Sequence, residues 1–247
     1  MPLYAHALTR VGGSNVLRMV PRHLFRDQPA PLQAVAPLGH TGVVTAQDPR
    51  VVRIWALVGE SIAGATHALL AGDRELAKSI VRDDEIIDGL VNTLVDEVTA
   101  ELESGVGTPS ERRGLVALVR TLPELERNGD LAAHIARRAA RGLGQEMSPR
   151  ARGLVERMGE VAIHMWRATT DCYAERQPMA ASLVDTLDDE MDDLHVSLTM
   201  EVVAGAMPLP VAVELAMVAR FYERFGDHAV NLAKRVAMLA PPADPVI

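Results

Sequence analysis

The chain has few aromatic residues, a single cysteine and no long uninterrupted apolar run. Only 3% of its 247 residues are Phe, Trp or Tyr, and since strands favour aromatic and β-branched residues, this composition favours helices. The lone Cys172 excludes an intramolecular disulfide, so we expect it to be a small buried apolar side chain. No apolar stretch of about 18 residues and no apolar secretory signal is present. The sequence therefore predicts a cytoplasmic protein without membrane insertion.

Negative charge is concentrated in the body of the chain. The formal net charge is −8. Residues 1–47 carry four arginines against one aspartate, which is +3, so the remainder carries −11. An acidic surface repels phosphate backbones, which argues against nucleic-acid binding. Acidity of this kind suits cations or basic partner surfaces instead.

The N-terminal segment and the rest of the chain have different patterns. Residues 1–47 are rich in Pro and Gly and show no sustained helical or strand period, which predicts a poorly ordered arm. From Asp48 onward, apolar residues recur at helical spacing and chain breakers separate the segments. The sequence predicts an all-α protein with six long helices, at 48–71, 73–104, 109–141, 148–176, 178–205 and 208–239.

Comparison of the chain with itself reveals a duplication. Residues 126–138 match residues 223–235 at an offset of 97, with Glu, Arg, Gly, Asp, Ala and the final Arg at equivalent places. Two looser matches, of 84–90 with 188–194 and of Gly59-Glu60 with Gly159-Glu160, have offsets of 104 and 100. The predicted unit is therefore a three-helix bundle present twice, at 48–145 and 146–240.

Each predicted bundle carries pairs of carboxylates four residues apart. Residues at this spacing share one helix face, and like charges there repel. The pairs are Asp84 with Asp88, Glu126 with Asp130, Asp188 with Asp192, and Glu223 with Asp227. A glycine inside each second motif, Gly129 or Gly226, adds a cost of about 1 kcal/mol relative to Ala. Such unfavourable features at matched positions indicate a functional or packing constraint.

Helical-hairpin geometry is expected to bring four carboxylates together in each repeat. Turns near residues 106 and 206 place the acids of the second and fifth helices opposite those of the third and sixth. Clusters of oxygen donors suit Mg²⁺, Ca²⁺, Mn²⁺ or iron. One further helical turn reaches His134 in the first repeat and Asn231 in the second, which extends the candidate metal site.

These acids have two other interpretations. They could form a solvated face whose charges pair with Arg127 and Arg224, in a helical scaffold that binds partners without metal. A carboxylate-bridged di-iron enzyme would need Glu-x-x-His on two helices, and the chain offers only Asp192-x-x-His195. Nucleophile motifs, phosphate-binding glycine loops and Cys/His zinc spacings are absent from the sequence. A non-enzymatic protein is therefore expected.

The duplicated Glu-Arg-x-Gly-Asp motif, with its preceding Asp pairs, resembles the PhoU family over about residues 50–240. The resemblance implies two pseudo-symmetric three-helix bundles, often dimeric, that bind metal through the acidic motifs. It also implies negative regulation of the phosphate regulon together with the ATPase subunit of the phosphate ABC transporter and a sensor histidine kinase. Two features depart from the family pattern, namely the Pro-rich arm and Asn128, which stands where the second copy has Phe225.

Overall fold

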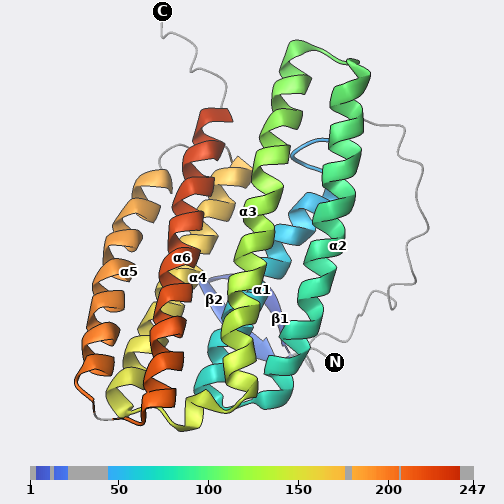
Figure 1. Ribbon diagram of the computed structural model, residues 1–247. Coiled ribbons are helices and arrows are strands. Elements are labelled where there is room, and N and C mark those ends of the chain that lie inside the picture. The colour runs from blue at the N-terminus through green and yellow to red at the C-terminus, as the bar shows by residue number, and fades with distance from the viewer. Residues whose placement is uncertain (1–3, 12–13, 22–43, 176–179, 206, 240–247) are drawn as a thin grey trace, which may run out of the picture. The chain divides into compact units, whose positions relative to one another are not determined.

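The computed structural model describes residues 4–11, 14–21, 44–175, 180–205 and 207–239. The chain divides into two compact units, residues 1–42 and 43–247. The first contains a short hairpin and the second contains all of the described helices, which Figure 1 colours in chain order.

The N-terminal unit holds a two-stranded antiparallel sheet. Strand β1 (Tyr4–Val11) pairs with β2 (Ser14–Pro21), so that Val11 lies opposite Ser14. The prediction that the arm lacks regular structure is therefore wrong for these residues. Two consecutive glycines, 12 and 13, separate stretches of equal length, and a Gly-Gly pair in that position is a hairpin signal. Residues 22–43 of the arm lie outside the described part of the chain.

The second unit consists of the six expected long helices and one short 3-10 helix. The helices are α1 (Pro49–Ala71), α2 (Arg74–Ser104), α3 (Pro109–Ala140), α4 (Pro149–Glu175), α5 (Ala180–Val203) and α6 (Leu209–Leu239), with η2 (Leu143–Gln145) between α3 and α4. Each end lies within two residues of its predicted position. The prediction of six long helices in two three-helix repeats is confirmed.

Local chemistry explains where these helices begin and end. Asp48 caps α1 by accepting from the Arg50 N–H at 2.8 Å, and Pro49 occupies the first turn, where a missing N–H costs nothing. Thr108 and Glu111 form a reciprocal capping box at the start of α3, which satisfies two otherwise free backbone N–H groups. Gly105 ends α2 with φ of 66°, a left-handed conformation that favours glycine.

The packing of the helices is the same in the two repeats. α2 packs on α1 and α3, and α5 packs on α4 and α6, while α1–α4 and α3–α6 contacts join the repeats. Figure 1 shows the α2–α3 turn and the α5–α6 turn at opposite ends of the bundle. Apolar side chains fill the space between the helices, and Ile54, Ile62 and Leu69 of α1 are fully buried. α2 and α5 are thus the outer helices, each facing solvent on one side.

The repeated Gly-Glu pair belongs to the packing of α1 against α4. A Cβ at Gly59 would lie 3.0 Å from Cδ1 of Trp166, and one at Gly159 would lie 2.2 Å from Cγ2 of Thr66. The two glycines therefore allow α1 and α4 to approach closely. Glu60 and Glu160 beside them are exposed, so the recurrence of this pair is explained by packing of the glycines.

Among the described residues, α1 alone is long and apolar enough to span a membrane by length and composition, with 44% of its most apolar window buried. Its apolar stripe, which includes Val51, Trp55 and Val58, packs in the interior of the bundle. A core helix of a folded bundle satisfies the same criteria of length and apolarity.

Candidate metal-binding faces

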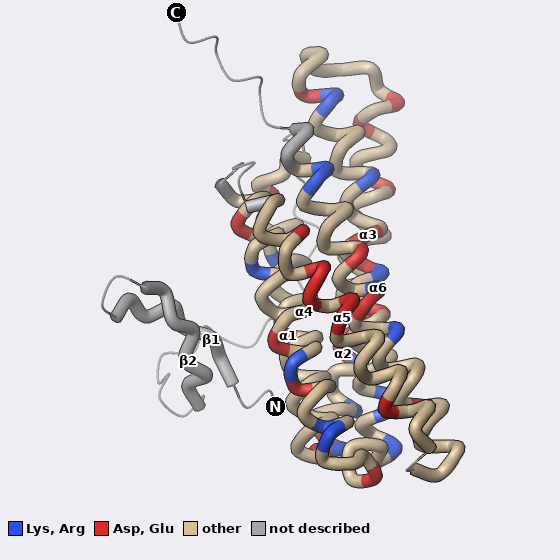
Figure 2. The backbone as a smooth tube through the Cα atoms, turned by 90° about the vertical axis from the view of Figure 1, so that its left-hand side faces the viewer, with Lys and Arg blue, Asp and Glu red and all other residues tan. Residues whose placement is uncertain are grey.

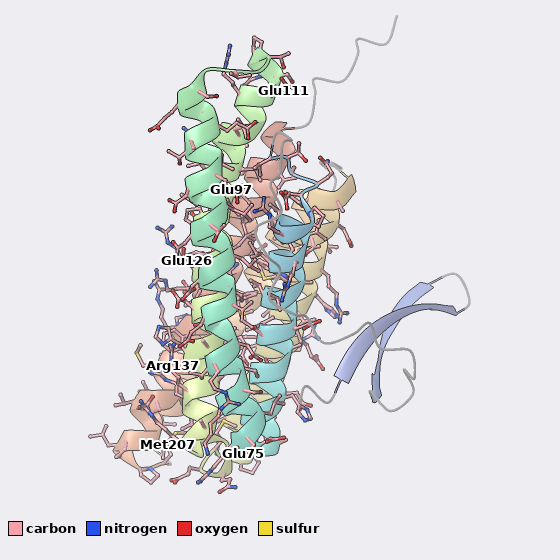
Figure 3. All side chains as sticks on the ribbon, turned by 90° about the vertical axis from the view of Figure 1, so that its right-hand side faces the viewer. Glu75, Glu97, Glu111, Glu126, Arg137 and Met207 are labelled. Atoms are coloured by element: carbon pink, nitrogen blue, oxygen red, sulfur yellow. The ribbon has the colours of Figure 1, made fainter. Side chains whose placement is uncertain are left out.

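The first acidic cluster lies where α2 packs against α3. The side chain of Asp84 is buried, and burial together with the nearby charges of Asp130 and Asp88 raises its pKa to about 6. Burial, followed by Asp130, raises the pKa of Asp88, and burial followed by Asp88 and Asp130 raises that of Glu126. The four predicted carboxylates therefore influence one another electrostatically. Figure 3 labels Glu126 midway along the bundle.

The second cluster, between α5 and α6, has the same composition. Burial and the charges of Asp192 and Asp227 raise the pKa of Asp188 to about 6. Burial and Asp227 raise the pKa of Glu223, and Asp192 contributes in the same direction. Figure 2 shows acidic positions gathered around α5, midway along the bundle. The four acids expected to meet in each repeat thus influence one another electrostatically, while their role as metal ligands stays a prediction.

The glycine of each motif creates the space that the deepest aspartate occupies. A Cβ at Gly129 would lie 3.2 Å from Oδ1 of Asp84, and one at Gly226 would lie 3.3 Å from Oδ1 of Asp188. Contacts this short are tighter than ordinary van der Waals packing, so a side chain at either position would press on the carboxylate. The equivalent approach in both repeats explains why two helix-interior glycines are present despite their cost to helix stability.

Some carboxylate oxygens of the clusters lack hydrogen-bond partners within the described residues. Oδ1 of Asp88 in the first cluster and Oε2 of Glu223 in the second are buried and have no partner there. Buried polar atoms are normally paired. One free buried oxygen in each cluster indicates that these groups have capacity for a further ligand.

Each cluster also contains one basic side chain that the sequence analysis did not select. Nη2 of Arg137 lies 3.6 Å from Oδ2 of Asp84, and Lys234 lowers the pKa of Asp188 and pairs with Asp185 at 3.3 Å. Arg137 and Lys234 are equivalent at the offset of 97. Each follows the motif aspartate by seven residues, two helical turns, and that spacing was the available signal. These cations partly offset the repulsion among the acids.

His134 and Asn231 have different surroundings from the acids. The ring of His134 stacks on Phe221 with centroids 5.1 Å apart, and its Nδ1 lies 3.0 Å from Nη1 of Arg137. Burial, and after it the charge of Arg137, lowers the pKa of His134, while Asp130 acts in the opposite direction. Asn231 is exposed on α6. His134 is therefore near the first cluster but is held by packing, and both residues remain candidate ligands only.

Among the described residues, the arginines adjacent to the motifs make no ion pair with a cluster acid, although the charge of Arg127 acts to lower the pKa of Glu126. Arg127 pairs with Glu124 at 3.2 Å, and Arg224 is exposed. Glu223 is instead contacted by Arg220, one turn earlier on α6. The expectation that Arg127 and Arg224 pair across the bundle with the motif acids is not what the structure shows. The ion pairs of the clusters come instead from Arg137 to Asp84 and from Arg220 to Glu223.

The donor set fits a hard cation in chemistry but not yet in geometry. A bound divalent ion or iron is favoured by the oxygen donors and by the one free buried oxygen in each cluster. The space beside Gly129 and Gly226 favours it as well. Within the described part of the chain, however, no group of three or more His, Cys, Asp or Glu side chains is arranged so that it could hold one ion. Metal binding would therefore require these side chains to change rotamer.

The raised pKa values predict an unusual pH dependence for the metal-free protein. The pKa of Asp84 rises from 3.8 to about 6 on folding, so the folded state holds this proton more tightly. The stabilisation that comes from this tighter proton binding is complete below pH 3.8, and it is lost as the pH rises through about 6. Asp84→Asn should therefore increase the free energy of unfolding at pH 7, on the order of 2 kcal/mol, and much less at pH 4. Urea titrations in EDTA at both pH values measure this, and an equal effect at the two would contradict it.

The fold and the two faces define a class of protein. It is a duplicated all-α bundle with an acidic face in each half, where a helix-interior glycine leaves room for an aspartate. The PhoU domain sequence model matches residues 51–139 and 155–236, one match per repeat. These matches cover more than half of the chain, and the chain belongs to the PhoU domain family.

Relatives and solved structures agree with this assignment. The chain is 31% identical over 199 residues to the phosphate-specific transport system accessory protein PhoU homolog 2 of Mycobacterium tuberculosis, covering 79% of this chain and 93% of that protein. The corresponding homolog of Rhizobium meliloti is 29% identical, with 79% and 84% covered. The crystal structure of PhoU from Pseudomonas aeruginosa superposes with a TM-score of 0.71 at 27% identity, covering 77% of this chain and 93% of that one.

Proposed function

We propose that this chain is an accessory regulator of phosphate uptake and phosphate-starvation signalling that acts by protein contact and not by catalysis. Membership of the PhoU family supports this role, since its relatives are accessory proteins of phosphate-specific transport systems. The observation that carries the proposal is the pair of equivalent acidic clusters, built by matched residues of the two repeats. Duplicated sites of this kind are expected for a protein that senses or holds ions symmetrically.

In this proposal each cluster binds a divalent cation or iron. The first site would use Asp84, Asp88, Glu126 and Asp130, and the second would use Asp188, Asp192, Glu223 and Asp227. A bound cation neutralises four acids that otherwise repel. It would also connect α2 to α3 and α5 to α6, and thereby stabilise the outer helix of each repeat.

The proposed partners are proteins of the phosphate response. By family resemblance they are the ATPase subunit of the phosphate ABC transporter and a sensor histidine kinase, contacted in the cytoplasm by a homodimer. A di-iron enzyme remains the less favoured alternative. Asp192 and His195 lie one turn apart on α5 and His195 lowers the pKa of Glu223, but the sequence holds no equivalent histidine in the first repeat.

Two measurements on one preparation test the proposal. Protein purified without a metal-chelating tag should contain iron, manganese, magnesium or calcium by elemental analysis, at up to one site per repeat. The same protein should retain the transporter's ATPase subunit in a pull-down. Metal-free protein that still retains the subunit would support the scaffold interpretation, and failure to retain the subunit would contradict the regulatory role.

A further inference from the structure

A groove of about 500 Å³ lies along the N-terminal half of α3. Its floor is partly apolar, and Val116 within it is 43% exposed. Arg235 of α6 forms one wall. The residues that line it are Pro109, Arg112, Arg113, Val116, Ala117, Arg120, Thr121 and Arg235.

Among the described residues that line this groove, every charged side chain is an arginine, although the chain as a whole carries −8. Two of them are anchored, since Arg112 donates to the carbonyl of Gly107 at 2.9 Å and Arg235 pairs with Glu124 at 3.1 Å. Arg113 and Arg120 are exposed and make no ion pair with any described residue. Arg113 and Arg120 thus give the groove positive charge that no described acid pairs with, beside apolar surface.

The second repeat contains the counterpart of this groove, and there the charge is compensated. A smaller cavity of about 180 Å³ is lined by Arg138, Arg141 and Glu214, among others. Nε of Arg138 lies 2.7 Å from Oε2 of Glu214, and Nη1 of Arg141 lies 3.7 Å from Oε1 of the same carboxylate. Glu214 is supplied by α6, so the second groove holds its own acid.

The offset of 97 relates the two grooves residue by residue. Arg138 corresponds to Arg235, and Glu214 corresponds to Ala117. The first groove therefore lacks the equivalent of Glu214, and its Arg235 pairs instead with Glu124 of α3. Ala117 lies on the groove floor next to Val116, between Arg113 and Arg120 along α3. Any carboxylate that reaches this position must come from outside the α3 segment.

We propose that the first groove is a docking site for an acidic segment of a partner protein, with a Glu or Asp side chain above Ala117 and an apolar side chain against Val116. The carboxylate would meet Arg120 and Arg235, in the place that Glu214 takes beside Arg138 in the second groove. Arginine suits this role because its planar donors pair with carboxylates in a defined geometry. The inference rests on the proposed function only in that the chain acts through protein contacts.

A peptide segment fits this groove better than a free anion or a nucleic acid. A single small anion would fill only a small part of 500 Å³ and would leave Val116 uncovered. The acidic body of the chain repels a polynucleotide at long range. An acidic segment with an apolar anchor satisfies both the arginines and the apolar floor, as in other grooves that bind amphipathic segments.

Ala117→Glu is the most direct test, because it supplies from within the chain the acid that the second repeat already has. The probes are short fluorescein-labelled peptides in which a leucine is flanked by two glutamates, together with the same peptides carrying glutamine. In fluorescence anisotropy the parent should bind the glutamate peptides at least about tenfold more tightly than the glutamine peptides at low salt. Ala117→Glu should weaken glutamate-peptide binding by about tenfold or more, and Arg120→Glu should do the same.

Two matched controls distinguish the effect of a charge at position 117 from the effect of side-chain volume there and from a change of net charge elsewhere on the chain. Ala117→Gln adds nearly the same volume without charge and should keep binding within about threefold of the parent. Arg82→Glu reverses an exposed arginine on α2 far from the groove along the hairpin, and it should leave binding unchanged. Metal content should be the same in all four variants, which distinguishes failure of this site from failure of the acidic clusters.

Three results would overturn the proposal. One is absence of binding by every glutamate peptide at millimolar concentration in low salt, and another is equal loss of binding in Ala117→Gln and Ala117→Glu. The third is self-association of the parent in sedimentation velocity that Ala117→Glu abolishes, because the groove would then be filled by a second copy of the chain.

Discussion

The double variant Asp130→Asn and Asp227→Asn is expected to lose metal uptake and to remain folded. Asp130 raises the pKa of Asp84, Asp88 and Glu126, and Asp227 does the same for Asp188 and Glu223. These two aspartates therefore lie close enough to the other acids to repel their charges. Replacing groups in a metal site's outer shell costs roughly 10–100-fold in affinity, so loss of a central ligand should cost about 100-fold. Isothermal titration with Mn²⁺ and elemental analysis measure this loss.

Stability distinguishes a metal site from a salt-bridged surface in this variant. If the clusters await a cation, removal of one charge from each relieves repulsion, and the metal-free variant should unfold at the same or a higher temperature than the parent. Added metal should raise the unfolding temperature of the parent in a concentration-dependent way and that of the variant much less.

The control for this experiment is Asp83→Asn with Asp193→Asn, at two exposed acids of α2 and α5. It changes the net charge by the same amount and should leave metal uptake unchanged. Equal metal content in both double variants, or no thermal response of the parent to Mg²⁺, Mn²⁺ or Fe²⁺, would refute the site assignment.

The helices and the clusters could be predicted because short-range signals specify them. Asp48, Thr108 and Gly105 are standard cap residues that mark helix ends, and the spacing of four residues places two acids on one face. A turn of known position then sets which residues of two antiparallel helices meet. Internal duplication supplied an independent check, since the same acids recur at matched positions.

Features that depend on contacts between distant residues were not predicted. The Gly129–Asp84 approach requires knowledge of how far α3 penetrates toward α2. Arg137 and Lys234 lie seven residues beyond the motif aspartates, and only the packing of neighbouring helices brings them to Asp84 and Asp185. The pairing of β1 with β2 was not predicted, because residues 1–47 are rich in Pro and Gly and such a composition is typical of disorder. In each case the sequence contains the residues but does not specify which distant residues they contact.

Gly144→Ala is expected to cause a large loss of stability. Gly144 lies in η2, between the two repeats, and a Cβ there would lie 1.8 Å from the carbonyl oxygen of Leu69. That oxygen belongs to the backbone of α1 and cannot rotate away. The guanidinium of Arg152 also donates to the carbonyls of Leu70 and Gly144, which ties this corner to both helices.

Accommodating the methyl group therefore requires η2 to move away from the end of α1, with loss of the Arg152 hydrogen bonds. Overpacking of this kind costs about 3 kcal/mol or more, which should lower the unfolding temperature by roughly 6–12 °C for a domain of this size. Gly153→Ala is the matched control, because a Cβ at that position of α4 meets nothing within 4 Å. It should stabilise the helix by up to about 1 kcal/mol. Calorimetry of the three proteins in EDTA measures both effects. The corner is remote in sequence from every cluster acid, so metal bound per folded molecule should be unchanged in Gly144→Ala. An unfolding temperature equal to that of the parent would contradict the prediction.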